Sequence, residues 1–74
     1  MAISGMVFIP ARGKAEALAA RLRAAAGAEV RGVGPGGVAV VMEAETAGHL
    51  QRMSEEIMGW SEVAGLQLAY LHEE

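Results

Sequence analysis

The chain has 74 residues, of which 53% are hydrophobic, and six Lys and Arg against nine Asp and Glu give it a net charge of −3. This length fits one domain near the lower limit of what folds without a disulfide or a metal ion, and the complete lack of cysteine excludes disulfides and thiolate metal sites. The sequence has no run of about 18 apolar residues, so we expect no membrane insertion, and its acidic balance argues against nucleic acid as a partner.

The first third of the chain predicts a strand followed by a helix. Residues Ile3 to Ile9 form a β-rich apolar run that ends at Pro10, which cannot donate a hydrogen bond to a sheet. No basic leader precedes this run, so it favours a strand over a secretory signal. Residues Lys14 to Ala26 carry Ala and Leu at helical spacing, and Gly27 is a typical helix stop.

The remaining residues predict a hairpin, a second helix and a last strand. Residues Glu29 to Val33 and Val38 to Ala44 flank a Gly-Pro-Gly-Gly turn. Thr46 is a plausible N-cap for a helix that ends at Gly59. The last apolar run, Val63 to Leu71, alternates as a strand does, and the tail at 72–74 is expected to fray.

This order of elements is typical of a single α+β domain over residues 1–74. Two βαβ halves with right-handed crossovers give the ferredoxin-like βαββαβ arrangement, a four-stranded antiparallel sheet with both helices on one face. A similar Glu-Val-x-Gly-apolar segment follows each predicted helix, beginning at Glu29 and at Glu62, which supports two related halves. The other face of the sheet is then left uncovered.

The alternation of side chains assigns a face to each strand residue. Large apolar residues are expected to point to the helices, and these are Met6, Phe8, Val30, Val38, Val40, Met42, Leu66, Leu68 and Tyr70. The residues between them fall on the open face. We predict a peptide-binding surface there, formed by Gly5, Val7, Ile9, Ala39, Val41, Glu43, Gly65, Gln67 and Ala69. Its small residues leave room for the backbone of an amphipathic helix.

Three segments of the chain resemble the NapD family, the chaperones of the periplasmic nitrate reductase catalytic subunit. They are Ile3-Ser4-Gly5-Met6-Val7, Val40-Val41-Met42-Glu43-Ala44-Glu45 and Gly65-Leu66-Gln67-Leu68-Ala69-Tyr70. The resemblance implies a cytoplasmic protein that binds the twin-arginine signal peptide of the reductase precursor on its open sheet face and delays export while the molybdenum cofactor is inserted. Glu43 is our candidate to accept a hydrogen bond from a peptide arginine.

Other functions remain as alternatives from the residues themselves. A βαββαβ unit also serves as a small-molecule-sensing or dimerisation domain, in which two sheets pack face to face as a homodimer. An acylphosphatase-like enzyme would need an Asn to position water, and the chain contains no Asn or Asp, so we predict no catalytic residues. His49 and His72 have no second ligand at metal-binding spacing, so neither a metal site nor a cofactor is expected. Trp60 is expected to pack at the edge of the core or to contact a partner.

Overall fold

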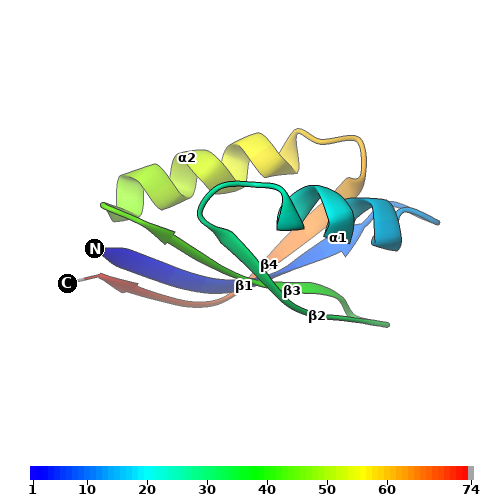
Figure 1. Ribbon diagram of the computed structural model, residues 1–74, viewed down its shortest axis with the longest axis horizontal. Helices are drawn as coiled ribbons and strands as arrows, with labels where there is room; N and C mark the ends of the chain where they lie inside the picture. The colour runs from blue at the N-terminus through cyan, green and yellow to red at the C-terminus, as the bar shows by residue number, and fades with distance from the viewer. Residues whose placement is uncertain (74) are drawn as a thin grey trace.

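The structure, a computed structural model, describes residues 1–73. The elements follow in the order β1 (Ala2–Pro10), α1 (Ala15–Arg23), β2 (Ala28–Gly34), β3 (Gly37–Ala44), α2 (Ala47–Met58) and β4 (Val63–Glu73). All strand pairs are antiparallel and the spatial order is β2-β3-β1-β4. Figure 1 shows both helices on one side of the sheet. The predicted ferredoxin-like α+β fold is confirmed.

The core lies between the two helices and one face of the sheet. Alternate residues of β1 and β3 enter it, which confirms the predicted period of two on these strands. Its fully buried members include Phe8, Val38 and Met42 from the strands and Leu18 and Leu22 from α1. Leu50 and Ile57 complete the core from α2. The sequence therefore assigned the inner face of the two central strands correctly.

The ends of the helices follow local signals. Thr46 caps α2, since its side-chain oxygen accepts a hydrogen bond of 3.1 Å from the backbone N–H of His49. Gly59 ends this helix as predicted. Helix α1 is shorter than its predicted span, because it ends at Arg23. A turn then leads to Gly27, which has a φ of 80° and directly precedes β2. The alanines at 24–26 favour helix intrinsically, but the chain must turn early there to enter the sheet.

Strand β4 departs from simple alternation at two places. The pairing with β1 shifts between Gly5 and Met6 and between Ile9 and Pro10, so that Ala69 and Ala64 are extra residues without a partner on β1. Each bulge moves the following side chains to the other face. The prediction that Tyr70 points to the helices was therefore wrong.

The C-terminal end of β4 is also more ordered than the sequence predicts. His72 pairs with Ile3 and Glu73 pairs with Ala2, so these two residues belong to the sheet. A carboxylate oxygen of Glu73 accepts a hydrogen bond of 2.8 Å from the backbone N–H of Ala47 at the start of α2. Negative charge is favourable at a helix N-terminus, so this contact ties β4 to α2. Glu74, the last residue of the predicted frayed tail, lies outside the described residues.

A charged cluster joins α1 to the loop after α2. The guanidinium of Arg21 lies 4.0 Å from the centre of the Trp60 ring and 2.9 Å from a carboxylate oxygen of Glu62. Trp60 is half-buried and packs against the core, in agreement with the first of its two expected roles. The pKa of Glu62 is lowered from its ordinary value, mainly by a hydrogen bond from its own backbone N–H. Desolvation opposes this effect, and the charge of Arg21 lowers the pKa further.

We expect the contribution of this carboxylate to stability to disappear in acid. Because its folded-state pKa is lowered, the contribution is complete above the unfolded-state pKa, near 4.5, and is lost as the pH falls through the lower folded-state value. Thermal unfolding of the wild type and of Glu62→Gln should differ at pH 7, and this difference should shrink as the pH falls below about 4.5. Glu16→Gln, at an exposed position of α1, is the control. A difference between wild type and Glu62→Gln that stays constant down to pH 3 would contradict this assignment.

Candidate peptide-binding face

The face of the sheet opposite the helices carries mostly small and apolar side chains. Val7 and Ala39 lie opposite each other at its centre, and Gly5 lies opposite Val41. The open face extends along β1 to Ile3, which pairs with Glu43 of β3, and in the other direction to Ile9, which is 42% exposed. In Figure 1 this face is the lower side of the sheet, and neither helix covers it. The predicted surface residues of β1 and β3 thus lie together.

Tyr70 covers Gly5 on this face. A Cβ atom placed on Gly5 would lie within 2.3 to 2.9 Å of three atoms of the Tyr70 ring, so the ring lies directly against the glycine backbone. Tyr70 is 46% exposed and pairs with Gly5 across the ladder. The absence of a side chain at Gly5 therefore makes room for an aromatic ring of the same chain. Alternation along β4 missed this residue, because the bulge at Ala69 reverses the faces.

Gly65, Gln67 and Ala69 occupy different positions along β4. Gly65 pairs with Ile9, and a Cβ on it would lie 3.4 Å from the Ile9 side chain. Gln67 is exposed and pairs with Val7 at the centre of the face. Ala69 is exposed but lies in the bulge, outside the regular ladder. The structure thus brings Gly65 and Gln67 beside the β1 and β3 rows, whereas Ala69 stands apart from them.

Two hollows lie along the face. The larger, about 400 Å³, is open to solvent and is lined by Val7, Ala39 and Gln67 together with the glycines of the hairpin. The smaller, about 170 Å³, lies toward the β2 edge and is lined by Gly27, Ala28, Glu29, Val41 and Glu43. The apolar surface therefore continues into an acidic hollow.

Glu29 and Glu43 bring two carboxylates to the acidic hollow. Glu29 pairs with Val41, which lies two residues from Glu43 on the same face. Glu29 accepts a hydrogen bond of 3.1 Å from Arg31, and both side chains are about two-thirds exposed, at 67% and 63%. An ion pair this exposed contributes little and is exchangeable for another guanidinium. The sequence predicted Glu43 alone; the pairing of β2 with β3 was the missing signal for Glu29.

Further features of the described residues concern metals and membranes. Among residues 1–73, no group of three or more His, Asp or Glu side chains is placed to hold a metal ion. Within the same range, no helix is long and apolar enough to cross a membrane.

Comparisons with known proteins agree with this architecture. The solution structure of the E. coli Tat proofreading chaperone NapD superimposes with a TM-score of 0.83 and 24% sequence identity, covering 97% of this chain and 77% of that one. The crystal structure of a hypothetical protein from Pyrococcus horikoshii superimposes with a TM-score of 0.82 and 18% sequence identity, covering 100% of this chain and 92% of that one. At these identities the likeness concerns the fold. No curated protein sequence matches the chain significantly.

The family model of the NapD protein matches residues 1–74, the whole of the sequence. This match confirms the resemblance seen in the three segments of β1, β3 and β4. The chain belongs to the NapD family.

Proposed function

We propose that this chain is a cytoplasmic Tat proofreading chaperone. Its client is the precursor of a periplasmic nitrate reductase catalytic subunit, and it binds the twin-arginine signal peptide of that precursor on the open sheet face. Occupation of the peptide delays export while the molybdenum cofactor is inserted. Membership of the NapD family and the fold shared with the E. coli proofreading chaperone support the proposal.

The observation that carries the peptide site is the uncovered apolar face. Val7, Ala39 and Val41 lie side by side there and are only partly exposed, so they form a low surface of small groups. A helical peptide can approach such a surface closely, and the Tyr70 ring would bound it near Gly5. Two or three Leu-sized side chains buried on it would contribute roughly 1.5 to 3 kcal/mol each, before the cost of ordering the peptide.

The acidic hollow supports a place for the arginines. A guanidinium is planar and donates two parallel hydrogen bonds to a carboxylate, which makes Glu43 and Glu29 suitable acceptors. The two carboxylates line a hollow that adjoins Val41, so one peptide could place its arginines there and its apolar residues along the strands. The net charge of −3 also favours a basic partner.

Isothermal titration with a synthetic twin-arginine leader peptide tests the proposal. We expect binding in the micromolar range or tighter, with changes in the methyl NMR signals of Val7 and Val41 on the open face. Sedimentation should show that the free protein does not form a tight homodimer, so that this face is free to bind the peptide. The absence of heat and of any thermal stabilisation by the peptide would refute the proposal, as would a tight homodimer that buries the face and takes up no peptide.

Removing the two carboxylates should weaken binding of a peptide that carries the two arginines and leave binding of an arginine-free peptide unchanged. Glu43→Gln combined with Glu29→Gln is expected to raise the Kd by about 10-fold or more, since a hydrogen bond to a charged group contributes about 1.5 to 3 kcal/mol. A peptide with both arginines replaced by glutamine should bind the wild type and the variant equally. The control is Glu16→Gln together with Glu55→Gln, which makes the same charge change on the helices. Equal losses in the control would assign the effect to net charge alone.

A further inference from the structure

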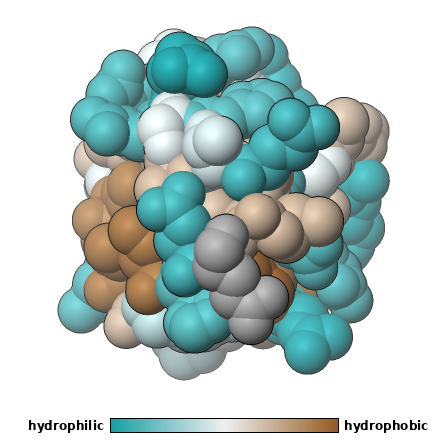
Figure 2. Space-filling model, turned by 90° about the vertical axis from the view of Figure 1, so that its left-hand side faces the viewer, coloured by the Kyte–Doolittle hydropathy of each residue, from teal (hydrophilic) through white to brown (hydrophobic). Residues whose placement is uncertain are grey.

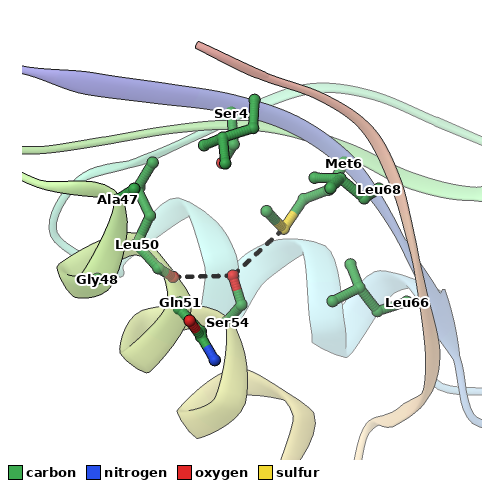
Figure 3. Close-up of a pocket in the computed structure, with 10 residues that line it drawn as sticks. Ser4, Met6, Ala47, Gly48, Leu50, Gln51, Ser54, Leu66 and Leu68 are labelled. Carbon is green, nitrogen blue, oxygen red and sulfur yellow. Dashed lines mark hydrogen bonds between the residues drawn. The ribbon is translucent and has the colours of Figure 1, made fainter. Parts of the chain in front are cut away.

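A further pocket, separate from the two hollows of the open face, lies on the opposite side of the sheet, between α2 and the strands β1 and β4. It has a volume of about 320 Å³, at the lower end of the range of small-molecule sites. Figure 3 shows Leu50 and Ser54 from α2 facing Met6 and Leu66 across it. Leu68 and Leu71 of β4 line it as well and are 57% and 53% exposed. Figure 2 shows hydrophobic side chains reaching the surface at the end of the molecule where the termini lie.

Ser4 supplies an unsatisfied hydroxyl at this pocket. The residue is only 1% exposed, and its Oγ has no hydrogen-bond partner. Figure 3 shows this oxygen on the side of β1 that faces α2. A buried hydroxyl without a partner is unfavourable, so native proteins rarely keep one without a reason. The hydroxyl is thus available to a ligand that enters the pocket.

The two other polar side chains of the lining, Ser54 and Gln51, already take part in hydrogen bonds. The Ser54 hydroxyl lies 2.9 Å from the carbonyl oxygen of Leu50 and 3.8 Å from the sulfur of Met6. The Gln51 side-chain amide donates to Glu55 at 3.2 Å. The lining residues include no charged side chain. An ionised ligand would lose its hydration without compensation, so the lining favours a neutral one.

We propose that this pocket binds a small neutral aliphatic molecule with one hydroxyl or carbonyl group, which forms a hydrogen bond with Ser4. The aliphatic part would lie among Leu50, Leu66 and Leu68. A partner strand added to the edge of β4 is less well supported, because the bulge at Ala69 interrupts the row of backbone groups that such a strand would need. The pocket is a site separate from the open face, and it does not rest on the peptide function.

The probes for this proposal are 1-octanol and n-octane, observed through the leucine methyl NMR signals of the protein. Both should shift the signals of Leu50, Leu66, Leu68 and Leu71, and saturation with 1-octanol should leave the affinity for a signal peptide unchanged. Ser4→Ala should lower the affinity for 1-octanol by about 3- to 10-fold, since one neutral hydrogen bond is lost, and leave the affinity for n-octane unchanged. Ser61→Ala, at an exposed serine, is the control.

A second variant tests the pocket independently of Ser4. Leu71→Asp places a charge at a half-exposed position of the lining and should weaken binding of both probes. The proposal is overturned if neither probe binds, if the shifts fall on the open face instead, or if Ser4→Ala binds 1-octanol as well as the wild type does. Loss of peptide binding with normal 1-octanol binding would count against the chaperone function alone.

Discussion

Replacing Ala39 by arginine is expected to weaken binding of a twin-arginine peptide by about 100-fold or more. Ala39 lies at the centre of the open face, where it pairs with Val7 of β1 and Gly32 of β2. A long charged side chain there would occupy the surface and repel the peptide arginines. Loss of one or two buried Leu-sized contacts, at roughly 1.5 to 3 kcal/mol each, corresponds to this decrease.

The fold should tolerate this change. Ala39 faces away from the core, and a Cβ placed on its neighbour Gly32 would meet no atom within 4 Å, so the arginine has free space beside it. We expect a change in unfolding free energy of no more than about 1 kcal/mol. Ala20→Arg, at an exposed position of α1, makes the same substitution on the helical side. Calorimetric titration of both variants decides the matter: equal affinities would remove the peptide site from this face.

Gly37→Ala is expected to destabilise the protein by about 2 to 4 kcal/mol, which combines backbone strain with steric overlap. Gly37 has a φ of 130°, a conformation that L side chains rarely adopt. A Cβ there would also lie 2.6 Å from the carbonyl oxygen of Phe8 and 2.8 Å from a methyl carbon of Val7. Because Phe8 is fully buried, its backbone cannot move without disturbing the core. For so small a domain this is a large part of the total stability.

The neighbouring glycine provides the matched control for that change. Gly36 has no positive φ, and a Cβ on it would meet no atom within 4 Å. Gly36→Ala should therefore change the unfolding free energy by no more than about 0.5 kcal/mol. Urea unfolding at equal protein concentration compares the two variants. Similar midpoints for Gly36→Ala and Gly37→Ala would show that the close approach of the hairpin to β1 is not a constraint.

The local patterns of the sequence determined most of the architecture. The Gly-Pro-Gly-Gly segment defined the hairpin, and Thr46 and Gly59 marked the ends of α2. Strict alternation placed Phe8 and Val40 in the core and Val7 and Val41 on the open face, since β1 and β3 pair with each other without a register shift. Where a strand is regular, the direction of each side chain follows from its position in the chain.

Only the tertiary structure decided the faces along β4 and the partners at the edges. The bulges at Ala64 and Ala69 arise from the pairing of β4 with β1, and nothing in the alternation of apolar residues marks them. The bulge at Ala69 turns Tyr70 onto Gly5, and the pairing of β2 with β3 brings Glu29 toward Glu43. Register between distant strands depends on how their side chains pack together, so a pattern within one strand cannot specify it.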